Sequence, residues 1–490
     1  MKIIVEKNRL RLKGVTDSLQ EKLREELSYF KKNFFMEPRY QSGDWDGRTG
    51  FIRAAKKSYL TEAGFLRRVV KVVARFPKKF RKLKIIDDRK KIKYNKKGLR
   101  KARKLVEERP FQQEVLENFI RVGYGLVHVG VGGGKTHVMS GLCMTYPKAK
   151  ILILVPTIKL LHKTIRVIYE HSGERAGQIG DGKWEDDTRI IVATYRSLFP
   201  IRQKKGGKLI WKKEARKIAR TVDLLMVDEC HHAIANNHKA FLREVRTHSR
   251  IGFSGTINLK NETLLCEGLF GPVLASYSLS WLIKMGYCAE ARIAWIKYPT
   301  KKVKTGSYRE DYDHSIVYNE NRNTVFNWFI KKLVRRDHLI LGLVRYLDHG
   351  EHLEEYFNEE GTEAHFIHGK MKSSYIDEMA DKLNDGEIPF LISTPIFDEG
   401  VDIPYVTTLL LAVGEQKEER LEQRLGRVLR AIGPKTHALI IDGYDGGSAT
   451  TAKHSRNRLK FYKKMGFEIR EYNFKKKNKV SFPPKIKTIS

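Results

Sequence analysis

Short apolar runs alternate with longer amphipathic stretches between residues 105 and 288. The runs rich in Val, Ile and Leu lie at residues 125–129, 150–156, 189–194, 223–229 and 250–256. Strands separated by helical segments are typical of sheets in which crossover helices join parallel strands. This part of the chain is therefore predicted to form an α/β domain.

The same alternation returns in the last third of the chain. Its apolar runs lie at residues 339–344, 364–369, 389–394, 407–413 and 437–443. We therefore expect tandem α/β domains with parallel sheets at residues 101–288 and 289–490, the second with a basic C-terminal tail. The polar stretch 297–315 is predicted to be an excursion rather than core.

The first hundred residues show a different pattern. Their short alternating stretches predict a small α+β domain at residues 1–100. The pair Asp46-Gly47, which lies between candidate strands, predicts a hairpin turn, and Trp45 beside it is predicted to be a core anchor. The lysine-rich run 79–104 is predicted to be a basic linker or helix.

The charge balance indicates a polyanionic partner. The 490-residue chain has 94 Lys and Arg against 57 Asp and Glu, a net charge of +37, and residues 1–100 hold 30 of the cations against 11 of the anions. Because neutralised phosphates release counterions, such a surface binds nucleic acid strongly and with salt sensitivity. A basic surface kept for solubility is the alternative. The basic insert 202–220 is interpreted as a nucleic-acid-facing loop or a solvated helix.

The sequence gives no sign of a membrane or secreted protein. No apolar run approaches the roughly 20 residues that span a bilayer, and the N-terminus lacks the apolar region of a secretory signal. The four cysteines include no Cys-x-x-Cys pair, which argues against a zinc site and fits a reducing compartment. We therefore expect a soluble cytoplasmic protein with no membrane partner.

The sequence HVGVGGGKT at residues 128–136 is predicted to bind phosphate. It follows an apolar strand and opens a helix, so that backbone N–H groups and the helix N-terminus can cradle anionic oxygens. Lys135 would meet the β and γ phosphates of ATP, and Thr136 would ligate Mg²⁺ through its hydroxyl. Val129 replaces the first glycine of the strict motif, and a bare glycine-rich turn is the alternative. The glycines that would face the phosphates are Gly130, Gly132, Gly133 and Gly134.

Two carboxylates follow the apolar run 223–227, at the edge of a parallel sheet where ligands bind. Asp228 is the candidate for holding Mg²⁺, and Glu229 for polarising the attacking water. His231 would relay the nucleotide state to the next segment, whereas His232 is interpreted as a surface or helix-capping residue. Acidic clusters at strand ends are common, so this prediction depends on the pairing with the phosphate loop.

A third set of charged residues lies in QRLGRVLR at 423–430, within a helix-like segment that also contains Arg424. Arg427 and Arg430 are three positions apart and would share a helical face, so both guanidiniums can point at one anion. They would then reach a γ-phosphate held by the other half, and hydrolysis would change how the halves close. The motifs together predict an ATP-driven motor. The alternative is a surface helix with ion pairs to Glu418, Glu419 and Glu422.

In this order, the motifs resemble those of helicase superfamily 2 over residues 105 to 445. The resemblance implies two tandem RecA-like domains, with ATP hydrolysis coupled to nucleic-acid unwinding. RPFQQ at residues 109–113 is similar to the Q motif of the family, which implies that Arg109 and Gln112 bind the nucleotide. The similarity of 423–430 to motif VI implies that the γ-phosphate is sensed by Gln423, Arg427 and Arg430.

Three further segments extend this resemblance. SGT is similar to motif III, where many relatives have alanine as the second residue, and it implies coupling by Ser254, Gly255 and Thr256. VPT at residues 155–157 resembles motif Ia. STPIFDEGVDIP at 393–404 resembles motif V, which implies nucleotide contacts from Gly400 and Asp402. Sequence-independent contacts to nucleic acid are expected near Pro156, Thr157, Thr194 and Thr394.

FMEPRYQSGDWDGR at residues 35–48 resembles the N-terminal domain of phage UvsW-type DNA helicases. The resemblance implies a DNA helicase or translocase that regresses forks and migrates Holliday junctions by unwinding and annealing, in DNA replication, recombination and repair. Branched DNA is then the expected partner, with contacts from Arg39 and Arg48, and the host cytoplasm is the expected location. An RNA helicase with the same motor, or a translocase of a repair or restriction system, is the alternative.

Overall fold

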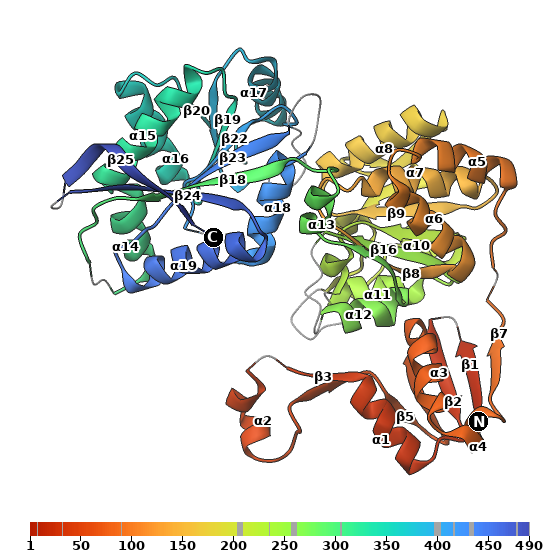
Figure 1. Ribbon diagram of the computed structural model, residues 1–490. Helices are drawn as coiled ribbons and strands as arrows, with labels where there is room; N and C mark the ends of the chain where they lie inside the picture. The colour runs from red at the N-terminus through yellow and green to blue at the C-terminus, as the bar shows by residue number, and fades with distance from the viewer. Residues whose placement is uncertain are drawn as a thin grey trace. The chain divides into compact units, whose positions relative to one another are not determined.

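The computed structural model describes the whole chain except residues 7, 32, 90, 203–208, 235, 256–261, 304–305, 396–402, 415–416, 431–435, 477–478 and 490. It divides into two compact units. The first comprises Met1–Val129 and Gly134–Tyr277, and the second comprises Gly130–Gly133 and Ser278–Ser490. Each unit is built around an eight-stranded sheet (Figure 1). The division into three domains at residues 100 and 288 stays a prediction.

The large sheet of the first unit has the strand order β11-β10-β12-β9-β15-β16-β8-β17. Its pairings are parallel except for the edge pair β10–β11. All five predicted apolar runs are confirmed, as β8, β9, β12, β15 and β16. The other strands have small or polar residues that weaken their pattern. The strands are β8 (Tyr124–Val129), β9 (Ile151–Val155), β10 (Ala176–Gly180), β11 (Lys183–Trp184), β12 (Ile190–Thr194), β15 (Leu224–Val227), β16 (Ser249–Ser254) and β17 (Val273–Tyr277).

Strand β16 lies between β15 and β8 in this sheet. The register pairs Met226 with Ile251 on one side of β16, and His128 with Ser254 on the other. Because all three strands are parallel, their carboxyl ends meet at one edge. The segment that follows Ser254 therefore lies between the segments that follow β15 and β8.

Helices cover both faces of this sheet, as crossover connections require. The basic insert is described from residue 209 onward, and it forms α10, whose Ala215, Ile218 and Ala219 are buried in the core. Over this part the structure has the helix of the second interpretation, with its charged residues exposed and an apolar face that packs into the core because the apolar residues recur at helical spacing. The helices are α5 (Lys96–Leu105), α6 (Pro110–Val122), α7 (Lys135–Thr145), α8 (Ile158–Ser172), α9 (Tyr195–Leu198), α10 (Lys213–Thr221), α11 (Asn236–Glu244) and α12 (Glu262–Phe270).

A five-stranded sheet with the order β5-β6-β2-β1-β7 lies in the N-terminal part of the first unit. Alternate residues such as Ile3 and Val5 point into a core that is completed by α1 and α3. The lysine-rich run 79–104 contains β7 and most of α5, so it is structured on both sides of a short connection. The elements are β1 (Lys2–Glu6), β2 (Arg9–Lys13), α1 (Asp17–Glu26), β5 (Arg53–Ala55), β6 (Ser58–Glu62), α3 (Leu66–Ala74), α4 (Pro77–Phe80) and β7 (Lys84–Asp87).

Residues 28–50 form an arm instead of the predicted tight hairpin (Figure 1). β3 (Ser28–Phe30) pairs with β4 (Arg48–Gly50), and the chain between them carries a 3-10 turn (Phe34–Met36) and α2 (Pro38–Gln41). A two-residue turn at Asp46-Gly47 is therefore wrong, because the partner strand of β4 ends before residue 31. Trp45 is not a core anchor either: it is half-buried, and its Nε1 donates to the Arg48 carbonyl at 2.7 Å.

The N-terminal sheet is joined to the large sheet of the same unit by buried polar contacts. Asn8 donates from Nδ2 to the Arg243 carbonyl at 3.0 Å, and its Oδ1 accepts from the buried Arg250 guanidinium. Arg68 also forms an ion pair of 2.6 Å with Glu267. Residues 1–95 thus supply one acceptor of the buried Arg250 guanidinium, which also donates to the Val245 and Thr247 carbonyls.

The sheet of the second unit has the order β20-β21-β19-β22-β23-β18-β24-β25 and is parallel except for β24–β25. The predicted runs are confirmed as β19 to β23, so the prediction of two tandem α/β domains with parallel sheets holds. The strands are β18 (Glu290–Lys297), β19 (Ile340–Leu343), β20 (His365–Ile367), β21 (Phe390–Ser393), β22 (Thr408–Leu411), β23 (His437–Gly443), β24 (Glu468–Lys476) and β25 (Lys479–Ile489).

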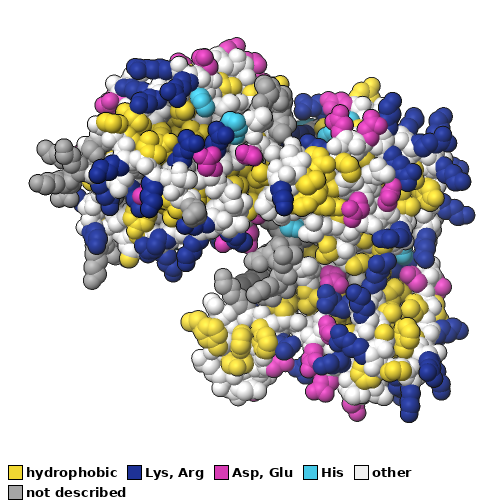
Figure 2. Space-filling view, in the orientation of Figure 1, with side chains coloured by type: hydrophobic (Ala, Val, Ile, Leu, Met, Phe, Trp, Pro, Cys, Tyr) yellow, Lys and Arg dark blue, Asp and Glu magenta, His cyan; other side chains and the backbone are white. Residues whose placement is uncertain are grey.

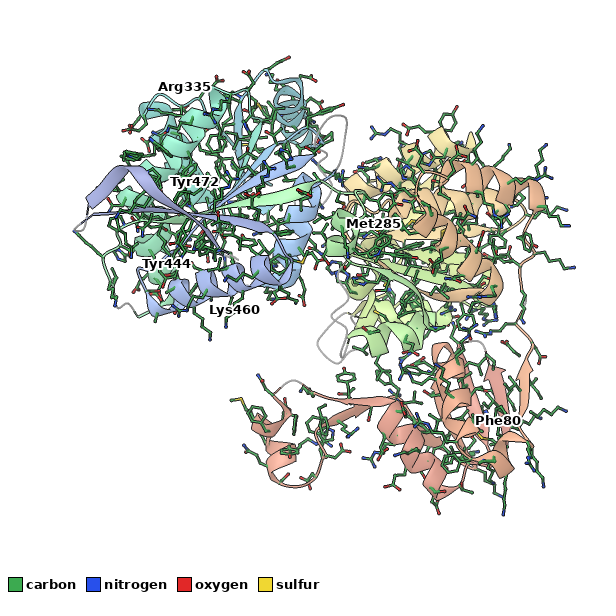
Figure 3. All side chains as sticks on the ribbon, viewed as in Figure 1. Phe80, Met285, Arg335, Tyr444, Lys460 and Tyr472 are labelled. Carbon is green, nitrogen blue, oxygen red and sulfur yellow. The ribbon has the colours of Figure 1, made fainter. Side chains whose placement is uncertain are left out.

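Helices pack on both faces of this second sheet. Ala294 of β18 belongs to a core cluster with α15 and α16, whereas the next residue, Trp295, contacts Tyr462 of α19 at 6.3 Å between ring centroids. Figure 3 labels Lys460 on α19 and Tyr472 on β24. The helices are α13 (Leu279–Lys284), α14 (Tyr308–Tyr312), α15 (Glu320–Val334), α16 (Leu347–Glu359), α17 (Ser373–Asp385), α18 (Glu418–Val428) and α19 (Ala449–Lys464).

The polar stretch 297–315 is not an excursion along its whole length. Its second half forms α14 and the start of a π-helical turn (Asp313–Val317). Tyr312, the last residue of α14, is fully buried. Polar residues hid this packing, because they line the outer face, where Arg309 pairs with Asp313 at 2.9 Å. Among the described residues of both units, no helix is long and apolar enough to cross a membrane.

Candidate nucleotide site

The predicted phosphate loop connects β8 to α7, and its conformation requires glycine. Gly134 has a φ of 75° at the N-cap of α7, and the Gly133 N–H donates to the Gly130 carbonyl at 3.1 Å. A Cβ on Gly134 would collide with the Gln112 side-chain amide and would lie 3.6 Å from Arg109 Nη1. The structure thus brings both Q-motif residues against the loop, where a nucleotide would meet the helix N-terminus.

Lys135 begins α7 and is held by both predicted carboxylates. Its Nζ lies 3.4 Å from Asp228 Oδ1 and also forms an ion pair with Glu229. All three side chains are largely buried, at 10 to 18% exposed. Burial alone would lower the pKa of Lys135, but the charges of Asp228 and Glu229 outweigh it and raise that pKa. The Lys135 side chain is therefore a charged ammonium, which can bind an anionic phosphate.

The two carboxylates differ in their electrostatics. Burial raises the pKa of Asp228, and the charge of Lys135 offsets this only in part. Burial would raise the pKa of Glu229 too, but the charge of Lys135 lowers it to about 2. Glu229 also has a φ of 44°, in the left-handed region that a non-glycine residue adopts only when its surroundings hold it there. Glu229 is thus kept ionised, as a group that polarises water must be.

Glu229 is connected to the segment resembling motif III. The Gly255 N–H donates to Glu229 Oε2 at 3.3 Å, and His231 Nδ1 lies 2.8 Å from Ser254 Oγ and 3.4 Å from Glu229. Burial lowers the pKa of His231 to about 4, although the charge of Glu229 opposes that shift. The structure therefore brings His231 to the place from which it was expected to relay the nucleotide state. His232 is exposed, as expected of a surface residue.

His128 completes this connection from the opposite side, and no role was predicted for it. Its Nε2 lies 3.0 Å from the Gly255 carbonyl, and its Nδ1 lies 3.1 Å from Ser276 Oγ. Since a carbonyl only accepts, Nε2 carries the proton and Nδ1 accepts from the Ser276 hydroxyl. Burial lowers the pKa of His128 and keeps the ring neutral. Its position in the strand directly before the phosphate loop is the one signal that could have indicated it.

Tyr195 is a second residue that the sequence did not indicate. Its hydroxyl donates to the Asp228 carbonyl, and it lies 3.3 Å from the Glu229 carbonyl. The ring is fully enclosed and stacks on Phe199 at 5.3 Å between centroids. Tyr195 therefore fixes the backbone that carries both carboxylates, and no motif marks it.

The expected nucleic-acid residues lie at strand ends or directly after them. Thr157 follows β9 and caps α8, where its hydroxyl accepts from the Leu160 N–H at 3.3 Å, and Pro156 directly precedes it. Thr194 ends β12 and lies 2.8 Å from Ser197 Oγ, while Thr394 follows β21 and is buried. The hydroxyls of Thr157 and Thr194 already have hydrogen-bond partners within the protein, and Thr394 is buried. Contacts to nucleic acid from these positions stay a prediction.

The arginines of the second unit differ from the expectation in one respect. α18 ends at Val428, and Arg430 forms an isolated antiparallel bridge with Cys288, so Arg427 and Arg430 do not share a helical face. Arg424 is buried, and Gln423 lies one position before it on α18. The proposed phosphate-sensing role of these residues stays a prediction.

Three predicted positions, Thr256, Gly400 and Asp402, lie outside the described residues. Thr136 is the second residue of α7, which places its hydroxyl in the first turn beside Lys135. In the N-terminal arm, Arg39 is exposed on α2, whereas the Arg48 guanidinium lies 4.3 Å from the centre of the Phe30 ring. The two arginines expected to contact DNA therefore lie on the same arm.

Comparisons with known families match both large domains. Residues 105–259 match the family described as "Type III restriction enzyme, res subunit", and residues 324–432 match the "Helicase conserved C-terminal domain". The first match contains Lys135, Asp228 and Glu229, and the second contains Arg427 and Arg430. Both groups of charged residues thus lie inside recognised domains.

Individual relatives extend the similarity to the whole chain. The chain is 22% identical over 483 residues to the "ATP-dependent DNA helicase uvsW" of Enterobacteria phage T4, covering 93% of this chain and 92% of that protein. It is 25% identical to the "DNA 3'-5' translocase XPB2" of Sulfurisphaera tokodaii, over 72% and 85% of the two chains. The fold also resembles Saccharomyces cerevisiae Dbp5 bound to RNA and ADP BeF3, with a TM-score of 0.52, 15% identity and coverage of 76% and 93%.

Proposed function

This chain belongs to the superfamily 2 helicases and is an ATP-hydrolysing helicase, and on that premise we propose that it remodels branched DNA. It would regress forks and migrate Holliday junctions by coupled unwinding and annealing. The observation that carries the motor part of the proposal is the buried group of Lys135, Asp228 and Glu229 at one sheet edge, joined through Gly255 to the coupling segment. Such a group links phosphate chemistry to movement of the chain.

The preference for DNA has separate support. Similarity to the phage DNA helicase spans 483 residues and thus includes most of the N-terminal part, which the two family matches do not reach. That part holds 30 Lys and Arg against 11 Asp and Glu in residues 1–100. A basic surface of this kind binds phosphate backbones without reading their sequence. We infer that substrate choice resides there, whereas the two large domains supply the motor.

The residues around Lys135 fit ATP together with Mg²⁺. Thr136 and Asp228 offer the hydroxyl and carboxylate oxygens that Mg²⁺ prefers, and Gln112 and Arg109 lie against the loop that would hold the nucleotide. When bound, Mg²⁺ would neutralise charge on the phosphate oxygens. Glu229 would orient the attacking water, and Gln423, Arg427 and Arg430 would sense the γ-phosphate, as the resemblance to the family implies. Thr157, Thr194 and Thr394 would grip one strand by its phosphates.

An unwinding assay tests the proposal directly. A four-way junction, a fork and a simple duplex, each made in DNA and in RNA, are compared for ATP-dependent strand separation and for stimulation of ATP turnover. We expect the DNA junction and fork to be processed faster than the duplex, and DNA to be favoured over RNA. Equal or stronger stimulation by RNA would identify an RNA helicase with the same motor. Translocation without any preference for branches would identify a simple translocase.

A further inference from the structure

The N-terminal arm ends in an exposed group of apolar side chains, which we call the aromatic tip. Figure 2 shows hydrophobic side chains gathered on this arm. Phe35 and Met36 are 58% and 67% exposed, and Phe30 and Tyr40 are also exposed. Large apolar side chains usually pack inside a domain, so a group of them on the surface indicates a binding site. The aromatic tip consists of Phe30, Phe34, Phe35, Met36 and Tyr40.

The aromatic tip is an ordered structure. The Phe34 ring lies at its centre, with ring centroids 5.0 Å from Phe30 and 4.7 Å from Tyr40. Gly47 packs so closely on Phe34 that an added Cβ would overlap the ring. The Lys31 N–H also donates to the Gly47 carbonyl at 2.9 Å, which ties the two sides of the arm together. The arm thus presents Phe35 and Met36 from a fixed scaffold.

Strand β3 shows that the aromatic tip is separate from the domain core. Tyr29 packs against the N-terminal core and lies 6.1 Å from Phe51 between ring centroids. The next residue, Phe30, points to the other side of the strand and is exposed. Among the described residues, the core cluster of this domain contains no member of the aromatic tip. Folding of the domain therefore does not explain these side chains.

Two arginines lie beside the aromatic tip, and the nearby carboxylates of Glu37 and Asp46 are paired with Lys31 and Arg24. The Arg48 guanidinium lies 4.3 Å from the centre of the Phe30 ring, and Arg39 is exposed on the neighbouring α2. Exposed aromatic rings next to arginines match the two parts of a nucleotide, because rings stack on bases and guanidiniums bind phosphates. A binding site for an apolar protein surface would not require these two arginines. The combination favours nucleic acid as the occupant.

We propose that the aromatic tip is a base-stacking site for the branch point of DNA, with Phe35 and Met36 packed against the bases that lose their stacking partner there. Arg39 and Arg48 bind the flanking phosphates. Apolar side chains that enter a duplex at a step where stacking is broken offset the cost of opening it. A branch point has such a step already, so the aromatic tip selects branches over continuous duplex. The inference rests on the proposed function and names the substrate feature that is recognised.

The test uses the full chain and a four-way DNA junction with 2-aminopurine at the branch point. Phe35→Ala and Met36→Ala remove the exposed side chains and keep the Phe34 ring with its contacts to Phe30 and Tyr40, although Phe35→Ala also removes an edge contact of 5.9 Å between the Phe34 and Phe35 ring centroids. Each should reduce the ratio of junction-stimulated to single-strand-stimulated ATP turnover about tenfold, the loss expected for one stacked base. The fluorescence change of 2-aminopurine on binding should fall in parallel. Phe35→Trp, which keeps an aromatic ring, should restore both signals.

Phe80→Ala is the matched control. Phe80 ends α4 in the same basic part of the chain, is 46% exposed and is labelled in Figure 3, but it lies outside the aromatic tip. This control should keep the parental ratio. If Phe35→Ala and Met36→Ala also keep it on a junction that the parental protein processes, the inference is overturned and the proposed function stands. If the parental protein processes no junction, the proposed function itself fails. If the variants change only self-association in sedimentation, the aromatic tip binds protein and the inference is again overturned.

Discussion

Lys135 Nζ lies 3.4 Å from Asp228 Oδ1 while it also pairs with Glu229, so one ammonium is shared by two buried carboxylates. An incoming γ-phosphate would compete with those carboxylates for the same cation. Glu229 would then lose part of its counter-charge at the moment when it has to orient water. The bond from the Gly255 N–H to Glu229 would carry that change to the coupling segment.

Replacement of Lys135 tests the first step. Lys135→Ala should reduce ATP turnover by roughly a hundredfold or more, because it removes the group that stabilises the transferring phosphate. DNA binding, measured by fluorescence anisotropy, should change little. Lys101→Ala, at an exposed position of α5, is the control and should keep the parental rate. A Lys135→Ala protein that turns over ATP at the parental rate would refute the site.

His128 is expected to couple hydrolysis to movement. His128→Ala removes the bond to the Gly255 carbonyl, which is worth about 1 kcal/mol, and should lower the number of base pairs opened per ATP about fivefold. ATP turnover should fall less, because His128 contacts neither carboxylate among its described bonds. His128→Gln, which keeps a donor, should recover part of the coupling. Equal losses in turnover and unwinding would assign His128 to hydrolysis instead.

The arginines of the second unit allow a test of the predicted phosphate sensor. Arg427→Ala and Arg430→Ala should each lower ATP turnover by about a thousandfold if the guanidiniums stabilise the transition state. Lysine at either position should not restore the rate, because it lacks the planar bidentate donor. Arg456→Ala, on the exposed face of α19, should behave like the parental protein. Parental rates in both Arg427→Ala and Arg430→Ala would exclude these two arginines from the predicted phosphate sensor.

Buried histidines predict a loss of stability in acid. Burial lowers the pKa of His248 from 6.5 to about 4, and the charge of Arg89 acts in the same direction. The unfolded chain therefore binds a proton below about pH 6.5 that the folded chain does not accept until about pH 4, so stability is full above that window and falls through it. Within this window, one such histidine lowers the free energy of unfolding by up to roughly 1.4 kcal/mol for each pH unit of acidification.

Calorimetric unfolding at several pH values through this window checks the prediction. His248→Gln removes one titrating group, so its unfolding temperature should depend less steeply on pH than that of the parental protein. His162→Gln is the comparison, because His162 is exposed on α8 beside Asp181. An unchanged slope in His248→Gln would mean that this ring binds its proton equally well in the folded and the unfolded chain, and would contradict the lowered pKa.

The sequence predicted most of both large sheets, and it singled out Lys135, Asp228 and Glu229, which the structure brings together. Buried parallel strands are continuous apolar runs, and a phosphate loop needs a glycine at each tight position. Both features can therefore be recognised from short segments of the sequence. Prediction failed where polar residues covered a packed helix, as at 308–315, or where a turn signal did not close a hairpin, as at Asp46-Gly47. Those outcomes depend on which distant residues supply the other half of a core or a strand pair.

The sequence by itself determined which side chains are available for phosphate chemistry, because Lys135, Asp228 and Glu229 belong to motifs a few residues long. Only the tertiary structure decided that β16 lies between β15 and β8, and this order puts the Gly255 peptide within reach of both Glu229 and His128. It likewise decided that Asn8 meets Arg250, which lies 242 positions away along the chain. Strand order and domain packing minimise the free energy of the whole chain, so no short segment specifies them.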